Sequence, residues 1–198
     1  MRWQLVIVQG LSLLRVVLAP VFVALAWRMP PLWGWALGVI AVAAASDLFD
    51  GFLARWWRVQ TALGAALDPL GDKVFCLTVL AALTYAGHWP RALWWAMVAR
   101  DVALVMGFWM LRTQGVLGAA QPLLSGKIYT ALVLFVIFVR VAALFLQQLK
   151  GGAFQHLTCP AHGVWTVLWA AVWLSLVVSA VHYTVMGARL WKVSLKTV

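Results

Sequence analysis

The sequence predicts an all-α integral membrane protein with six transmembrane helices, and three observations support this fold class. Hydrophobic residues make up 65% of the 198-residue chain and charged residues only 10%, which gives a mean hydropathy of +0.95. A water-soluble domain of this length cannot bury so much apolar side-chain surface. Six apolar stretches are long enough to cross a bilayer, which takes about 20 residues, and turn or polar residues separate them. We expect one membrane domain over residues 1–198, with no soluble appendage.

The first three expected helices cover residues 11–28, 33–54 and 62–87. Met29-Pro30-Pro31 ends the first of them, because proline lacks an amide donor and restricts the residue before it. A basic, polar turn from Arg55 to Gln60 separates the second from the third. Arg15 interrupts the first apolar run and no convincing cleavage site follows, so we interpret this stretch as a retained span and not as a signal peptide.

The other three expected helices cover residues 91–111, 127–147 and 164–187. His88-Trp89-Pro90 precedes the first of these, and polar segments at residues 112–126 and 147–163 separate the rest. The last segment carries His156, Cys159 and His162, which are zinc-ligand residue types. Their spacing is short and a fourth ligand is missing, so we favour a chance arrangement over a zinc site.

Basic residues predict the orientation of the chain and exclude nucleic acid as a partner. The formal net charge is +10, but no basic docking face of the kind that nucleic-acid-binding proteins carry is evident. Lys and Arg gather on cytoplasmic loops and near anionic lipid headgroups. With the N-terminus inside, eight basic residues fall on the cytoplasmic side and three on the opposite side. We therefore expect both termini in the cytoplasm and membrane lipids around the helices.

All five acidic residues are aspartates, and four of them fall within 26 residues. The window reads Asp47-x2-Asp50-Gly51-x2-Ala54-Arg55-x8-Gly64-x3-Asp68-x3-Asp72. A carboxylate in so apolar a helix costs roughly 2.5–3.5 kcal/mol on the mild insertion scale, and four neighbouring carboxylates also repel one another. Positive charge must therefore hold them, and the ordered spacing favours a metal-centred catalytic site.

The spacing places these four carboxylates on two facing helix ends. Residues three or four apart share a helix face, so Asp47 pairs with Asp50 and Asp68 pairs with Asp72. The first pair ends the second expected helix, and the other begins the third, after a short basic turn. Carboxylate oxygens suit Mg²⁺ or Mn²⁺, and several of them can hold two ions for a displacement at phosphorus.

Small residues and one arginine follow the same helix stripe. Gly51, Ala54 and Gly64 each lie four residues from an aspartate, and small side chains let helices or a bulky ligand approach closely. Ordinary helix packing explains the glycines alone, but it does not explain four carboxylates on the same stripe. Arg55 is placed to meet phosphate, and an anchor at the cytoplasmic surface is the alternative interpretation.

Two function classes other than a metal-dependent enzyme are weaker. An ion or proton transporter also uses intramembrane aspartates, but these are usually scattered among helices along a path through the bilayer. A purely structural membrane protein gains nothing from four clustered carboxylates. Arg100 stands next to Asp101, the fifth aspartate, and we interpret it equally as part of a structural ion pair or as a substrate-binding group.

The aspartate window resembles the signature of the CDP-alcohol phosphatidyltransferases, including its x8 and both x3 spacings. Gln9-x2-Ser12-x2-Arg15-x4-Pro20 is similar to the first helix of that family, which usually has Asn and Thr at the first two places. Asp68-Pro69-Leu70-Gly71-Asp72-Lys73 resembles the glycerol-type branch, which includes phosphatidylglycerophosphate synthases and CMP-forming cardiolipin synthases. Arg100-Asp101 and Ser125-Gly126-Lys127-x2-Thr130 are similar to its fourth and fifth helices.

This resemblance implies a six-helix, CDP-alcohol phosphotransferase-like fold, often a homodimer, with its active site facing the cytoplasm; we expect the inner membrane of a bacterium. It implies that Asp47, Asp50, Asp68 and Asp72 ligate two Mg²⁺ or Mn²⁺ ions, with Asp72 also the general base. It implies that the nucleotide and diphosphate site is shaped by Ser12, Gly51, Ala54, Arg55 and Gly64. The implied reaction moves a phosphatidyl group from CDP-diacylglycerol to an alcohol and releases CMP.

The acceptor that this resemblance favours is glycerol 3-phosphate, as in phosphatidylglycerophosphate synthases. Phosphatidylglycerol, used by CMP-forming cardiolipin synthases, is the alternative. A phosphorylated acceptor needs a basic cluster, for which the candidates are Arg100, Arg112, Lys127 and Arg189. Asp101 stands where glycerophosphate synthases commonly carry Glu, which makes the Arg-Asp pair more similar to that of cardiolipin synthases.

Overall fold

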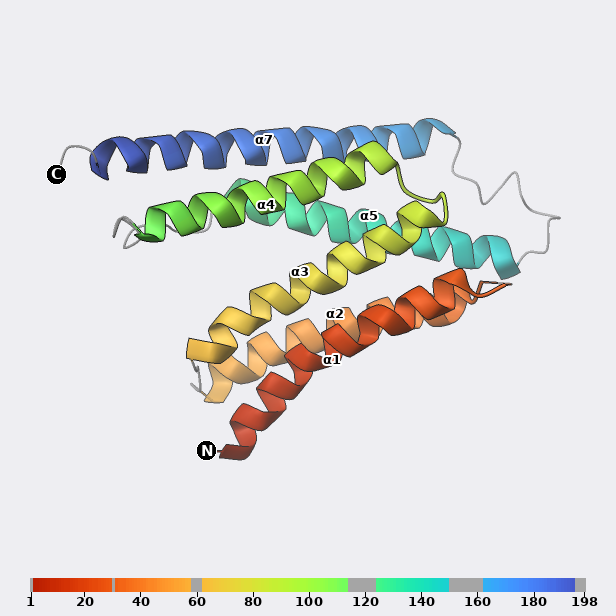
Figure 1. Cartoon of the computed structure of the whole chain (residues 1–198). Coiled ribbons are helices and arrows are strands. Elements are labelled where there is room, and N and C mark those ends of the chain that lie inside the picture. Colours follow the sequence, from red (N-terminus) through yellow and green to blue (C-terminus); the bar gives the residue numbers. More distant parts are fainter. Residues whose placement is uncertain (1, 30, 58–61, 114–123, 150–161, 195–198) are drawn as a thin grey trace. The chain divides into compact units, whose positions relative to one another are not determined.

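Six helices account for the regular structure of the described chain. The computed structural model describes residues 2–29, 31–57, 62–113, 124–149 and 162–194, with the side chains of only part of them. Within these ranges no strand occurs, which confirms the all-α fold class (Figure 1). The helices are α1 (Arg2–Trp27), α2 (Trp33–Trp57), α3 (Ala62–Tyr85), α4 (Arg91–Thr113), α5 (Leu124–Leu149) and α7 (His162–Ser194).

The breaks between helices fall where the sequence predicts them, but α1 and α7 extend furthest beyond their expected bounds. α1 begins at Arg2, nine residues before the expected start, and α7 continues to Ser194, seven residues past the expected end. The prediction was wrong there because it followed hydropathy alone. No proline occurs at either extension, and basic side chains at a membrane surface can reach the headgroups while their backbone stays helical.

Within the described residues, three helices are long and apolar enough to cross a membrane by length and composition: Arg91–Met110 in α4, Leu124–Leu149 in α5 and Gly163–Arg189 in α7. The other helices contain shorter apolar segments, at Leu13–Trp27, Trp33–Ser46 and Lys73–Tyr85. In the sequence, charged residues interrupt the apolar runs of both helices, since α2 contains Asp47 and Asp50 and α3 contains Asp68 and Asp72.

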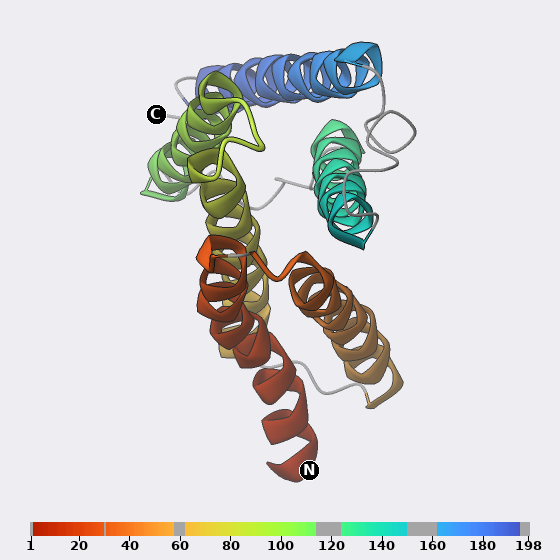
Figure 2. The same cartoon turned by 90° about the vertical axis from the view of Figure 1, so that its right-hand side faces the viewer.

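The chain divides into two compact units, and the expectation of a single domain stays a prediction. The first unit comprises Met1–Trp89 and Ile137–Thr158, and the second comprises Pro90–Val136 and Cys159–Val198. In the first unit α1 packs against both α2 and α3. Its buried core residues include Phe22, Ala26, Ala36, Ile40, Val79, Leu80 and Leu83. α2 runs antiparallel to α1, and α3 antiparallel to α2 (Figures 1 and 2).

The end of α3 is closed by a glycine in a left-handed conformation. Gly87 has φ of 76°, which residues with a Cβ rarely adopt. The amide of Gly87 donates to the carbonyl of Thr84 at 3.1 Å, and that of His88 donates to the carbonyl of Leu83 at 2.8 Å. This Schellman arrangement satisfies carbonyls that the helix end leaves open, so the break before Pro90 has a specific local cause.

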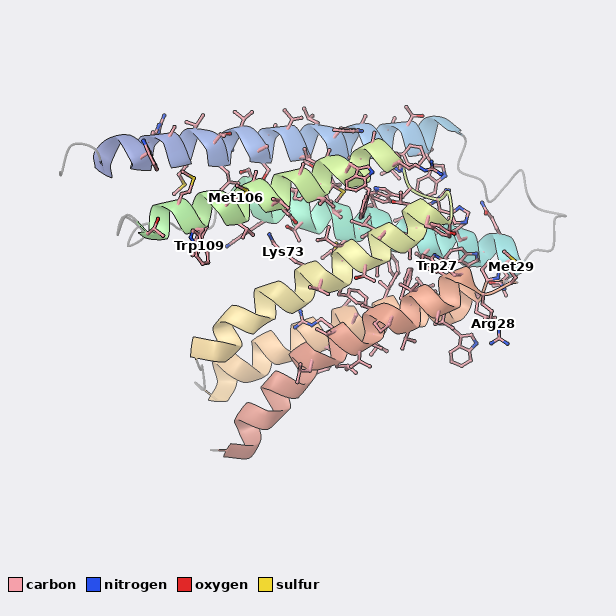
Figure 3. All side chains as sticks on the ribbon, viewed as in Figure 1. Trp27, Arg28, Met29, Lys73, Met106 and Trp109 are labelled. Carbon is pink, nitrogen blue, oxygen red and sulfur yellow. The ribbon has the colours of Figure 1, made fainter. Side chains whose placement is uncertain are left out.

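In the first unit, polar side chains form hydrogen bonds at the helix ends that lie away from the aspartates. Gln148 accepts a hydrogen bond from the backbone amide of Trp33 at 3.1 Å and donates one to the carbonyl of Pro31 at 2.9 Å. Arg140 Nε donates to the carbonyl of His88 at 3.0 Å, and the ring of His88 meets Trp33 edge-on at 5.3 Å between centroids. α1 ends at Trp27, and Arg28 and Met29 follow it (Figure 3).

In the second unit α4 packs against α7. Its buried core residues include Leu93 and Met97 of α4, Val133 and Val136 of α5, and Trp165, Val172 and Leu176 of α7. Large apolar side chains also face outward, among them Met106 and Trp109 (Figure 3). Outward apolar side chains are what a lipid-facing helix requires.

Candidate functional site

The four clustered aspartates lie at matching depths on two antiparallel helices. Asp50 is seven residues from the end of α2 and Asp68 is six residues from the start of α3, or about 10 and 9 Å along the helix axes. Asp47 and Asp72 each lie ten residues from those ends, or about 15 Å. The connection between Trp57 and Ala62 is short, so Asp50 and Asp68 lie at similar distances from it along their helices, as do Asp47 and Asp72.

Continuous helix at both pairs supports the face-sharing that the sequence predicts. Residues 47–57 and 62–72 are helical without interruption, so the backbone positions of Asp47 and Asp50, like those of Asp68 and Asp72, have the three- and four-residue spacing that a single helix face requires. The nucleotide-site candidates Gly51, Ala54 and Arg55 continue α2 toward its end, and Gly64 lies in the first turn of α3. These backbone positions fit a donor set of hard oxygen ligands grouped with small residues.

The first helix reaches the same depth as the aspartates. Ser12 lies fifteen residues and Arg15 twelve residues before the end of α1, and Asp47 lies fourteen residues after the start of α2. At 1.5 Å per residue, these depths are about 22, 18 and 21 Å. Because α1 packs against α2 and α3, it is the third helix that contributes residues at the depth of the two aspartate pairs.

Side chains at the border of the aspartate region are buried or half-buried. The guanidinium-bearing Arg15 is 3% exposed and Ser46 is 5% exposed, and the Ser46 hydroxyl donates to the carbonyl of Ala43 at 2.8 Å. Gly71 is buried and Lys73, labelled in Figure 3, is half-buried. Arg15 is a buried cation in α1, which packs against the two helices that carry the aspartates. Carboxylates in a low-dielectric environment need positive charge nearby.

Most predicted site side chains lie outside the described part of the structure. They are Ser12, Asp47, Asp50, Gly51, Ala54, Arg55, Gly64, Asp68, Asp72 and Arg112. Among the side chains that are described, no three metal-ligating groups come together. His156 and Cys159 are outside the described residues, as is the side chain of His162. The assignments at these positions stay predictions.

Arg100 occupies a polar cluster within the second unit. Its Nη1 lies 2.7 Å from Asp101 Oδ1, and its Nη2 donates to the hydroxyl of Ser179 at 2.6 Å. Its guanidinium carbon lies 4.4 Å from the ring centroid of Tyr129 and 5.7 Å from that of Tyr183. The structural ion pair that the sequence offers as one interpretation is present, and the cluster joins α4, α5 and α7.

Two of the other acceptor candidates in the second unit, Lys127 and Arg189, have exposed side chains. Lys127 stands in the first turn of α5 and Arg189 in the last turns of α7. Sequence reasoning missed Tyr129, Ser179 and Tyr183 around Arg100. Tyr129 occupies an unspecified place inside the Ser125-Gly126-Lys127-x2-Thr130 pattern, and Ser179 and Tyr183 carry only the weak signal of polar atoms four residues apart in an apolar helix.

Comparison with known proteins identifies the family. The CDP-alcohol phosphatidyltransferase family matches residues 5–181, which is most of the chain. The chain belongs to this family. The match covers all four clustered aspartates, Arg100, Lys127 and Tyr129, so the resemblance noted from the motif extends over the helices of both units.

Relatives of two activities are similar to this CDP-alcohol phosphatidyltransferase. A CMP-forming cardiolipin synthase of Rattus norvegicus is 44% identical over 103 residues, 52% of this chain and 33% of that protein. The Homo sapiens cardiolipin synthase is 43% identical over 103 residues, 52% of this chain and 34% of that protein. A CDP-diacylglycerol–glycerol-3-phosphate 3-phosphatidyltransferase of Yersinia enterocolitica is 43% identical over 109 residues, 51% of this chain and 57% of that protein.

Proposed function

We propose that this chain transfers the phosphatidyl group of CDP-diacylglycerol to an alcohol and releases CMP. The observation that carries the proposal is the matched depth of Asp47 with Asp72 and of Asp50 with Asp68 on antiparallel helices. Membership of the CDP-alcohol phosphatidyltransferase family supports it. The orientation deduced from the basic residues puts this end of the helices on the cytoplasmic side, where a water-soluble nucleotide can enter and leave.

In this proposal, some of these residues bind the diphosphate and others bind or orient the acceptor alcohol. Asp47, Asp50, Asp68 and Asp72 are the carboxylates that would hold two divalent cations, Mg²⁺ or Mn²⁺. Such cations supply neutralisation of phosphate oxygens and of the leaving group. Arg55 binds the diphosphate, and the small residues Gly51, Ala54 and Gly64, with Ser12, leave room for the nucleotide. Asp72 accepts a hydrogen bond from the acceptor hydroxyl and orients its oxygen toward the phosphorus.

The acceptor in this proposal is glycerol 3-phosphate. Its phosphate would meet Lys127 and Arg189, whose side chains are exposed on α5 and α7, with Arg112 near the same surface in the sequence-based topology. The charge of Arg100 is already paired with Asp101, so Arg100 contributes less to anion binding than its sequence position suggests. The name of the Yersinia relative includes glycerol 3-phosphate, which is in line with this choice.

Phosphatidylglycerol is the second candidate acceptor, and one observation favours it. Neutralisation of Arg100 by Asp101 leaves fewer free cations for a phosphate monoester, which carries more charge than the diester of phosphatidylglycerol. The two mammalian relatives are named as CMP-forming cardiolipin synthases. We further propose that two copies of the chain form a homodimer.

The test offers labelled CDP-diacylglycerol to the full chain in lipid vesicles, with a panel of acceptors, and identifies the lipid product. We expect CMP release together with phosphatidylglycerophosphate. Cardiolipin in its place selects the second acceptor, and no CMP release with any alcohol contradicts the proposal.

Substituting Asp72→Asn tests the role of that carboxylate. The amide cannot accept the acceptor proton, so we expect CDP-diacylglycerol binding to persist while turnover falls by roughly 10²–10⁴-fold, the usual contribution of a positioned base. Ser46→Ala is the matched control, because Ser46 adjoins the first aspartate pair and its hydroxyl bonds only within α2. A near-normal rate in Asp72→Asn contradicts the assignment.

A further inference from the structure

The first turn of α5 is weakly helical by itself, yet it carries Lys127. α5 begins at Leu124, followed by Ser125 and Gly126, and glycine is a much weaker helix former than alanine. The first-turn amides also lack intrahelical partners. The Thr130 hydroxyl donates to the carbonyl of Gly126 at 3.0 Å, which is one local support. Contacts from other helices must supply the rest.

Contacts from α4 and α7 meet this turn on both sides of Lys127. Before it, a Cβ added at Gly126 would lie 2.7 Å from the Tyr183 hydroxyl and 3.1 Å from its ring, so Tyr183 lies directly against the Gly126 backbone. After it, the ring of Tyr129 lies under the Arg100 guanidinium at 4.4 Å. Tyr129 is 4% exposed, and Tyr183 also faces Arg100.

Arg100 is held in one orientation by groups on either side of it. Arg100 Nη1 donates a hydrogen bond to Asp101 at 2.7 Å, and Nη2 donates one to the Ser179 hydroxyl at 2.6 Å. Ser179 is completely buried. A planar guanidinium fixed by two bonds presents a rigid cationic face, which the electron-rich face of an aromatic ring attracts. A flexible ammonium would not present that face.

We propose that Arg100 is a positioning residue that sets where Lys127 stands, through Tyr129 on one side and through Tyr183 and Gly126 on the other. Asp101 and Ser179 orient Arg100, Arg100 and Tyr183 hold the start of α5, and Lys127 projects from that fixed turn. That Lys127 meets the acceptor phosphate rests on the proposed function. The placement of Lys127 itself does not.

The test measures the reactivity of Lys127 toward an acylating amine reagent in the full chain, with mass spectrometry of each lysine. Gly126→Ala pushes the Tyr183 ring away without touching any charge. We expect Lys127 labelling to change at least about twofold, because displacing that ring moves the turn that carries the exposed Lys127 side chain, even though alanine by itself favours helix. Gly107→Ala in α4 is the matched control, because a Cβ there meets nothing within 4 Å. Tyr183→Leu, which removes the ring without adding volume, should reproduce the change.

Kinetics then separate positioning from direct binding. For Gly126→Ala we expect the KM for glycerol 3-phosphate to rise roughly tenfold, as misplaced binding groups do, while kcat and the KM for CDP-diacylglycerol stay near their original values. Adding Tyr183→Phe should restore part of the loss, since it removes the atom closest to the new methyl group. Arg100→Lys keeps the charge but loses the planar fork, and should resemble Gly126→Ala.

Two results overturn the proposal. One is Lys127 labelling unchanged in both Gly126→Ala and Tyr183→Leu. The other is full retention of the acceptor KM in Arg100→Lys with loss only in Arg100→Gln, which means that Arg100 acts by its charge. If labelling changes as expected but glycerol 3-phosphate is not a substrate, the positioning role stands and only the proposed acceptor fails.

Discussion

In the first unit, the absence of a Cβ atom at one glycine allows two helices to approach each other closely. A Cβ added at Gly34 of α2 would lie 2.7 Å from one ring carbon of Phe145 and 3.1 Å from another. Only glycine leaves space for that ring. At Gly38, one helical turn further on, a Cβ would meet nothing within 4 Å. The pair provides a clean comparison, because both glycines lie in the same helix and lose the same backbone freedom.

Gly34→Ala should destabilise the protein by about 1–3 kcal/mol, the usual cost of overpacking a filled contact. Gly38→Ala should be neutral or slightly stabilising, since alanine favours helix by up to about 1 kcal/mol. Thermal unfolding of both variants, followed by circular dichroism in the same detergent, measures the difference. Equal midpoints would show that Phe145 can move aside without cost.

His88 gives the folded chain a pH dependence at the α3–α4 turn. Its pKa is lowered from the ordinary value of 6.5, first by burial and second by the nearby positive charge of Arg140. Above pH 6.5 the ring is neutral in both the folded and unfolded states, so this contribution is complete. As pH falls below 6.5, the unfolded chain takes up a proton that the folded chain resists, and stability decreases until the pH passes the lowered folded pKa.

We therefore expect the unfolding midpoint to fall between pH 7 and pH 5, and His88→Gln to remove part of that fall. Unfolding scans of both chains across this pH range measure it. The ring contact with Trp33 is also lost in the variant, so the slope with pH is the informative quantity and the absolute midpoint is not. Parallel slopes would exclude His88 as the source.

At the scale of elements, the start of α2 depends on a residue far away in the sequence. Trp33 opens α2, and Gln148 of α5 accepts a hydrogen bond from its amide while donating to the Pro31 carbonyl. First-turn amides have no partner within their own helix, and the connection here contains proline, which donates nothing. Gln148 thus acts as a cap supplied by another helix.

Gln148→Met should cost about 1–2 kcal/mol, because it keeps the side-chain volume but removes two hydrogen bonds of ordinary strength. Gln148→Glu keeps the acceptor for Trp33 and loses the donor to Pro31, so it should cost less. Amide hydrogen exchange at the first turn of α2 measures the effect locally. Protection that is unchanged in Gln148→Met would mean that packing alone holds this turn.

The elements that the sequence predicts best are those with strong local signals. Pro30-Pro31 and Pro90 mark breaks that the structure contains, and Gly87 supplies the left-handed residue that ends α3. The expected end of α7 was too early, because a helix can continue into a basic segment at its end. The expected start of α1 was too late, since the apolar residues Leu5 to Val8 also belong to this helix. Gln148 could not be foreseen as a cap, since it lies 115 residues from Trp33 and nothing local pairs them.

At the scale of the whole molecule, one part of the candidate site has a signal in the sequence and another part has none. The aspartates could be proposed as site residues because charge is rare in this chain and their spacing matches helical periodicity, and their roles stay predictions. The surroundings of Arg100 were not, because Ser179 and Tyr183 reach it only through the packing of α7 against α4. Long-range partners of this kind have no signature in a single sequence.

Removal of divalent cations tests the whole arrangement. With excess chelator we expect CMP release from CDP-diacylglycerol to stop, and Mg²⁺ or Mn²⁺ to restore it, because four carboxylates without counter-charge repel both one another and the diphosphate. Zn²⁺ should restore less, since it prefers nitrogen and sulfur ligands. Undiminished turnover in chelator would remove the metal-based mechanism.

The apolar stretch of α7 is longer than the hydrocarbon layer of a typical bilayer is thick. This stretch, from Gly163 to Arg189, has 27 residues, or about 40 Å of helix, against a hydrocarbon layer of roughly 30 Å. The helix must lean or protrude, and the lean relaxes as acyl chains lengthen. Because Arg189 marks the far end of that stretch, thicker bilayers draw it nearer to the hydrocarbon boundary, and turnover should therefore vary with acyl-chain length.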